Sequence, residues 1–214
     1  MRRPAALALA LTVAACATVP PPVPLSAAEA GPYISAWDQR REEAYAPRRL
    51  KALYRGEAAG KLGVAARGYL TIYWDGTTLH WRTSAPLATD VREGSLRRDG
   101  GAPGEATLFP PGLSAADIVG CLLGVLDLPA DGRPVSRVGP DIRLSLDDAG
   151  REGVLSPDGV VTGLRFPDGT RVTLEPASPL PVRLTAKGPK GSAKLVLESW
   201  AAWPEGEPVP GRGG

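Results

Sequence analysis

Few residues in this chain could do chemistry by their type and spacing. The 214 residues include two cysteines and one histidine. His80 could act as a general base, and Asp147 with Asp148 could form an acid–base pair. His80, however, falls on the polar side of an alternating strand pattern, and Ala149-Gly150 after the two aspartates indicates a turn.

No larger catalytic pattern is visible. One histidine and so few cysteines do not make up a metal-ligand cluster of the usual spacing. A nucleophile elbow, a P-loop and a dinucleotide-binding glycine pattern are all missing from the sequence. We therefore predict no catalytic residue, no metal site and no cofactor, and a protein that is not an enzyme.

Cys16 stands out because of the residues that precede it. Arg2 and Arg3 are followed by a short apolar run that ends at Val13-Ala14-Ala15-Cys16. A positive start, a short apolar run and small residues before a cleavage site are typical of a secretory signal. A membrane span needs about 20 apolar residues, which is more than this run offers. We predict that residues 1–15 are a signal peptide.

The end of this segment resembles the lipobox of bacterial lipoproteins. The resemblance implies cleavage before Cys16, a diacylglycerol on its sulfur and an acyl chain such as palmitate on its amine. Each buried CH₂ contributes about 0.8 kcal/mol, so two or three chains anchor a protein almost permanently. Ala17, in place of an aspartate, favours the outer membrane, with the domain facing the periplasm. The alternative is an ordinary signal with an incidental cysteine.

The composition narrows the classes of partner. Without Arg2 and Arg3, the 25 basic residues fall to 23, which equals the number of acidic residues. A balanced chain offers no basic footprint for nucleic acid. Cys121 then remains without a second cysteine for a disulfide. The 23 prolines and 26 glycines favour many short strands joined by turns.

The mature chain divides into a tether, one domain and a tail. We expect a lipidated N-terminus and proline-rich stalk at 16–32, a domain at 33–203 and a disordered tail at 204–214. The domain begins with a predicted helix over 33–49, and alternating strands follow from Leu50. Asp-Gly pairs at 75–76, 158–159 and 168–169 indicate tight turns between strands.

A second predicted helix begins at Ser114-Ala115-Ala116-Asp117, which has the pattern of a capping box. The helix is apolar on every side, so it is buried on both faces or covers an apolar cavity. Alternation puts several large side chains on one face of the neighbouring strands. The residues that we expect to line an apolar hollow are Leu70, Ile72, Trp74, Leu79, Trp81, Leu122, Leu126 and Trp200. The alternative is an ordinary packed core.

The order of these elements resembles the LolA/LolB-like lipoprotein superfamily, and within it the outer-membrane lipoprotein receptors of the LolB type. The segments that carry the resemblance are Gly60-Lys61-Leu62-Gly63-Val64, Thr83-Ser84-Ala85-Pro86-Leu87, Leu180-Pro181-Val182-Arg183-Leu184 and Lys194-Leu195-Val196-Leu197-Glu198-Ser199-Trp200. The resemblance implies an α+β fold, namely an incomplete antiparallel β-barrel (half-barrel) with a helical lid. It also implies that Pro86 and Leu87 form a membrane-insertion loop. The alternative for Leu87 is a buried loop residue.

Two functions follow as expectations. The first is a lipid-anchored protein that binds acyl chains of lipoprotein cargo, receives them from a periplasmic LolA-like carrier and helps to insert them at the outer membrane. The second is a non-catalytic accessory of envelope assembly, which uses the same fold as an interaction module with a filled hollow. In both cases we expect a monomer that binds no nucleic acid.

Overall fold

Strands dominate the computed structural model, which describes residues 20–45, 49–60, 65–84, 91–98, 114–126, 134–189, 191–204 and 206–207. The helices in these residues are α1 (Ala27–Tyr45) and α2 (Ala115–Leu123). The strands are β1 (Val23–Pro24), β2 (Leu50–Gly60), β3 (Ala65–Trp74), β4 (Thr78–Ser84), β5 (Arg92–Arg97), β6 (Val135–Val138), β7 (Asp141–Ser145), β8 (Glu152–Leu155), β9 (Val161–Arg165), β10 (Arg171–Glu175), β11 (Arg183–Gly188) and β12 (Gly191–Ala202).

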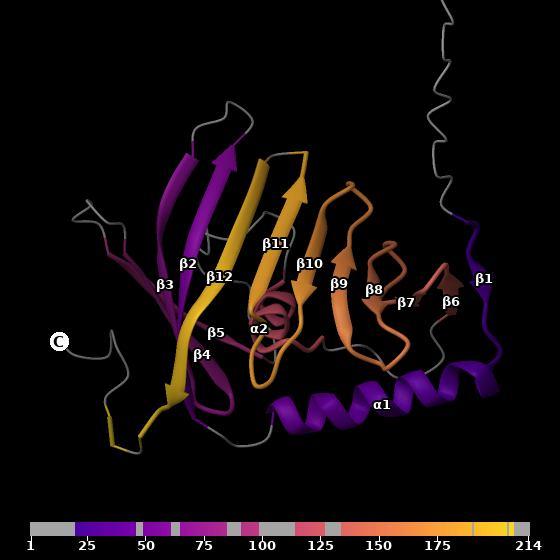
Figure 1. Ribbon diagram of the computed structural model, residues 1–214, viewed down its shortest axis with the longest axis horizontal. Coiled ribbons are helices and arrows are strands. Elements are labelled where there is room, and N and C mark those ends of the chain that lie inside the picture. The colour runs from indigo at the N-terminus through magenta and orange to yellow at the C-terminus, as the bar shows by residue number, and fades with distance from the viewer. Residues whose placement is uncertain are drawn as a thin grey trace, which may run out of the picture.

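All described strands form one antiparallel sheet in the order β1-β6-β7-β8-β9-β10-β11-β12-β2-β3-β4-β5. Strands β1 and β5 are its two edges, so the sheet is curved but not closed (Figure 1). The ladder between β2 and β12 joins the two halves of the chain, from the Gly60–Gly191 pair to the Leu50–Ala202 pair. The predicted fold class, an incomplete antiparallel β-barrel of the α+β type with helices over it, is confirmed.

The strand pattern of the sequence explains the curved face. In the β3–β4 hairpin, Ile72 is opposite Trp81 and Trp74 is opposite Leu79, as the alternation predicts. The predicted Asp-Gly turns join β3 to β4, β8 to β9 and β9 to β10, and each of their glycines has a positive φ. Alternation continues through residues 135–146, but these form two strands, because Gly139-Pro140 turns the chain between β6 and β7.

Helix α2 lies against the inner face of this sheet, and eight of its nine residues are buried. Ser114 and Asp117 form the predicted capping box at its start, and Gly124 ends it in the left-handed conformation. A fully buried leucine or isoleucine contributes about 1.5–3 kcal/mol, so this mostly apolar helix is a large share of the core.

Polar contacts fix both ends of α2 to the sheet. At its start, Arg151 Nη1 donates to Asp117 Oδ2 at 2.6 Å, while the same guanidinium also pairs with Asp147. Near its end, the Tyr54 hydroxyl lies 3.5 Å from the carbonyl oxygen of Leu122. Since Asp117 is only 9% exposed, Arg151 supplies the counter-charge that a buried carboxylate needs.

Helix α1 begins earlier than the sequence predicts and crosses beneath the strand ends on the β6–β10 side (Figure 1). The sequence predicts a start at residue 33, but α1 begins at Ala27 because Ser26 and Glu29 cap it. Pro32 lies inside the helix, where it lacks the N–H that would bond the carbonyl oxygen one turn earlier. Before it, Val23 and Pro24 pair with β6. Ordered structure therefore extends into the segment expected to be a stalk.

Several predicted features lie outside the described residues, among them Cys16, the signal segment and the Pro86-Leu87 loop. The predicted tail is described only at 204 and 206–207. Neither of the two described helices combines the length and the apolar character that a bilayer span requires.

The turn glycines Gly159 and Gly169 offer a paired test of how closely α1 packs. Both have a positive φ, of 72° and 85°. A Cβ on Gly159 would lie 2.8 Å from the Ala36 Cβ of α1, whereas a Cβ on Gly169 would meet nothing within 4 Å. We expect Gly169→Ala to cost about 1–2 kcal/mol for backbone strain alone. Gly159→Ala should cost a further ~1–3 kcal/mol for overpacking.

Urea unfolding followed by tryptophan fluorescence measures both free energies of unfolding. Equal losses for Gly159→Ala and Gly169→Ala would contradict the close approach of α1 to the β8–β9 turn.

Candidate functional site

Seven of the eight residues expected to line an apolar hollow lie together inside the curved sheet. All seven are at most 6% exposed and belong to one core cluster: Leu70, Ile72, Trp74, Leu79, Trp81, Leu122 and Leu126. Ile118 and Val119 of α2 belong to the same cluster. Side chains of α2 thus occupy the hollow at this level of the sheet. Contact of these seven residues with an acyl chain stays a prediction.

The eighth residue, Trp200, is placed differently. It is opposite Ala52 in the β2–β12 ladder, yet its side chain is 51% exposed. A bulge follows Leu197, and β11 pairs with β12 only as far as Val196. Beyond that point no described strand covers this edge of β12. Trp200 therefore does not belong to the buried cluster of the other seven, and its contact with an acyl chain stays a prediction.

Most of the described residues at the other end of the concave face are small. Gly56 is opposite Gly68 and Leu195, and Ala58 is opposite Ala66 and Ala193. Several of these residues remain partly exposed, unlike the large side chains around α2. The described part of the curved face is therefore lined by large side chains at the level of α2 and mostly by small ones at the other end.

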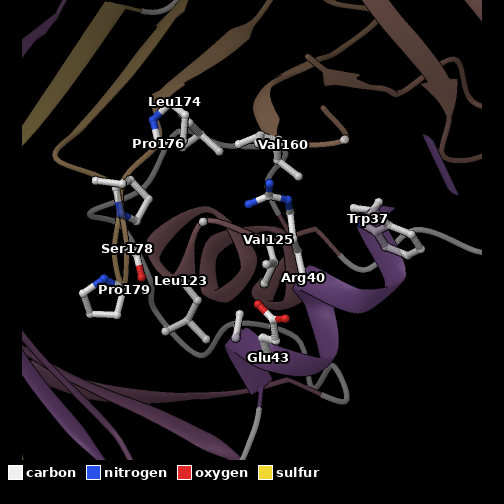
Figure 2. A pocket seen from close by; sticks show the side chains of 16 residues that line it. Trp37, Arg40, Glu43, Leu123, Val125, Val160, Leu174, Pro176, Ser178 and Pro179 are labelled. Carbon is white, nitrogen blue, oxygen red and sulfur yellow. The ribbon is translucent and has the colours of Figure 1, made fainter. Parts of the chain in front are cut away.

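A cleft of about 320 Å³ opens where α1, the end of α2 and the β10–β11 loop meet (Figure 2). This volume lies at the lower end of the range of ligand pockets. The residues around it are Trp37, Arg40, Glu43, Ala44, Leu123, Gly124, Val125, Gly159, Val160, Val161, Leu174, Pro176, Ala177, Ser178, Pro179 and Pro181. Its walls are thus mostly apolar, with prolines on one side and the end of α2 on another.

Two charged side chains of α1 reach into this cleft from the side opposite Pro176, Ser178 and Pro179 (Figure 2). Glu43 accepts a hydrogen bond from the Gln39 amide at 3.1 Å. Arg40 is exposed and has no hydrogen-bonding or ionic partner within the described part of the chain. The cleft therefore combines apolar walls with one unpaired guanidinium.

Trp37 adds a second donor beside the cleft. Its side chain is 1% exposed, and among the described residues nothing accepts a hydrogen bond from its indole nitrogen. Arg41 stacks on the indole ring at 4.8 Å. A buried N–H group without a partner is uncommon in folded proteins, and the indole nitrogens of Trp74 and Trp203 share this feature within the described residues.

Sequence reasoning missed this cleft because its walls come from four separate segments. The only local signals are the i, i+3, i+7 spacing of Trp37, Arg40 and Ala44 on one face of α1 and the cluster of prolines at 176–181. Neither signal indicates that the two segments meet.

The remaining chemistry-bearing residues form no second site. His80 is 7% exposed, which corrects its expected solvated position; its Nε2 atom lies 3.5 Å from Asp75 Oδ2. Asp147 and Asp148 lie in the predicted turn. The described residues contain no group of three or more side chains that could hold a metal ion.

Comparisons with known proteins return structural likenesses only. No family model matches the chain, and no curated protein matches its sequence at a significant level. A LolA superfamily protein from Nitrosomonas europaea aligns with a TM-score of 0.40 and 9% identity, covering 79% of this chain and 93% of its own. An outer membrane lipoprotein-sorting protein domain from Vibrio parahaemolyticus aligns at 0.44 and 10%, covering 80% and 92%.

A DUF1329 family protein from Desulfovibrio piger aligns with a TM-score of 0.42 and 10% identity, over 80% of this chain and 93% of its own. None of the three bears the name LolB, so the finer resemblance to that receptor stays a prediction. Likenesses at this level say nothing about the function of the chain, which has to be inferred from its own residues.

Because α2 is packed inside the curved sheet, we predict that Cys121 on this helix is unreactive. Burial, and then the charge of Asp117, raise the pKa of this thiol, which is 5% exposed. In a Cys16→Ser chain Cys121 is the only cysteine. We expect a maleimide to label it at least about 100-fold more slowly in the native protein than in urea, because only opening exposes the thiolate. Mass spectrometry over time measures both rates, and rapid native labelling would contradict the packing of α2.

Proposed function

We propose that this protein is a non-catalytic, lipid-anchored lipoprotein that binds an acyl chain of a lipid or lipidated protein. The observation that carries the proposal is the cleft between α1, α2 and the β10–β11 loop, with its apolar walls and unpaired Arg40. The open antiparallel sheet, with an apolar helix against its inner face, supports the same interpretation.

The chemistry of an acyl group matches the two parts of this cleft. A hydrocarbon chain gains about 25 cal/mol for each Å² that it buries against apolar walls such as Leu123, Val125 and Leu174. The ester or amide carbonyl at its head accepts hydrogen bonds but donates none through its oxygen. Arg40, and the buried indole N–H of Trp37 beside it, offer donors of the kind that such a head requires.

The other parts of the proposal concern the membrane. We propose that Cys16 carries the lipid anchor and holds the domain on the periplasmic side of the outer membrane. Leu87, following Pro86, would insert into the lipid interface. The cargo would be an acylated protein handed over by a periplasmic carrier of the LolA kind, to a receptor that acts as a monomer.

A second function is favoured by one observation, the filling of the curved face by α2. A half-barrel without an open hollow suits a non-catalytic accessory of envelope assembly that contacts partners through its surface. The two functions differ in whether the protein binds an acylated ligand.

Acyl binding is tested with the full chain carrying Cys16→Ser. We expect one N-palmitoylated peptide to bind per protein molecule, and its unacylated twin not to bind. Ala177 lies on the cleft wall, so Ala177→Trp would fill the space and weaken binding by at least about tenfold, or ~1.4 kcal/mol. Isothermal titration calorimetry measures stoichiometry and affinity.

Ala149→Trp is the matched control, because Ala149 is also an exposed loop alanine but does not line the cleft. Its affinity should equal that of the parent chain. Equal binding of the acylated and unacylated peptides, or no binding of either, would refute the acyl-carrier function and leave the interaction module as the better account.

A further inference from the structure

Three cations form a continuous row on the outer face of the sheet. Arg165 of β9 is directly opposite Arg171 of β10, and Arg171 is directly opposite Lys187 of β11. Arg171 and Lys187 are exposed, and Arg165 is half-buried. We call Arg165, Arg171 and Lys187 the basic row.

The charges of the basic row are not compensated as they are elsewhere on this face. Nearer the other end of the strands, Arg183 pairs with Glu175 at 2.8 Å and Arg55 pairs with Glu198 at 2.7 Å. In the basic row, no described acidic side chain is in ion-pair distance of the three cations. Like charges directly opposite each other destabilise a ladder, so the fold itself gains nothing from this arrangement.

The acidic groups near the row are already engaged. Glu152 is opposite Arg165 in the ladder, but its carboxylate lies 3.6 Å from Arg143. Asp168, in the β9–β10 turn, accepts a hydrogen bond from the Thr170 amide at 2.8 Å. Partial burial, and then the charges of Arg143 and Arg171, lower the pKa of Arg165, while the charges of Glu152 and Asp141 offset part of this lowering.

The start of the described chain limits how far the domain can stand from a lipid on Cys16. The described residues begin at Pro20, and Val23 is already paired with Arg137 of β6. Three residues lie between Cys16 and Pro20, and the four residue steps of a fully extended chain span at most about 14 Å. A domain anchored through Cys16 therefore lies against its membrane instead of standing away from it.

The basic row lies toward the same edge of the molecule as this starting point. Arg165 ends β9, Arg171 begins β10 and Lys187 is next to the last residue of β11. The β9–β10 and β11–β12 turns form the upper edge of the sheet in Figure 1, and the chain enters β1 from that side.

We propose that the basic row docks this edge of the sheet onto an anionic lipid surface, and so sets the orientation of the domain on its membrane. The orientation rests on the proposed anchor at Cys16, but the attraction of the basic row to anionic lipid does not. A Lys or Arg near such a surface strengthens binding about fivefold, and its attraction extends over about one Debye length, ~10 Å at 0.1 M salt. The mature chain has equal numbers of basic and acidic residues, so the attraction must be local.

The test uses the mature chain from residue 16 with Cys16→Ser, so that the apolar segment 1–15, a lipid anchor and an acylated ligand all take no part. Sedimentation measures its binding to vesicles of phosphatidylcholine alone and to vesicles with about one quarter phosphatidylglycerol. We expect binding only to the anionic vesicles, and loss of binding in about 1 M salt, where the Debye length is ~3 Å. Arg171→Gln with Lys187→Gln should weaken binding about 25-fold, from two factors of about five.

Arg55→Gln with Arg183→Gln is the control, because it removes the same charge from the same face at the other end of the strands. It should change binding by less than about threefold, and thermal melting checks that both variants fold. Equal effects of the two double variants would overturn the proposal. Absence of binding to anionic vesicles would also overturn it, and would leave an acidic protein as the partner of the row. Loss of acyl-peptide binding at the cleft leaves this result unaffected, so the two proposals fail separately.

Discussion

Burial of α2 inside the open sheet is the constraint on which the rest of this structure depends. The helix is apolar on all sides, and a curved sheet with a free edge on each side has an inner face that water would otherwise reach. Each element removes the exposed apolar surface of the other. The ion pair between Arg151 and Asp117, the capping box at Ser114 and the Tyr54 hydroxyl hold the helix at that depth. These contacts are directional, whereas the apolar burial is not.

The large inward side chains around Trp74 and Leu79 are covered by α2, while a cleft lies at the margin of the sheet, where α1 and the β10–β11 loop approach the end of α2. Such a position favours ligands that enter from outside and bind partly in solvent. Arg40 belongs to that margin, since a guanidinium without a counter-charge is stable only where water still reaches it.

The pairing of β1 with β6 limits the distance between the domain and the lipid anchor that we propose at Cys16. Because Val23 and Pro24 belong to the sheet, the proline-rich segment contributes a short connection instead of a long spacer. The same sheet presents paired charges on one part of its outer face and an unpaired basic row on another. A short connection and an uneven distribution of charge act together, because weak electrostatic attraction is effective only when the partner surface is held nearby.

The sequence by itself determined the local features of this protein: the alternation in β3 and β4, the Asp-Gly turns and the capping box at Ser114. Each is set by residues close together in the chain, so propensity and periodicity are enough. Only the tertiary structure decided that α2 fills the curve, that Trp200 is exposed and that Arg165, Arg171 and Lys187 form a row. These features depend on strand register and on where strands end, which long-range pairing fixes and local sequence does not encode.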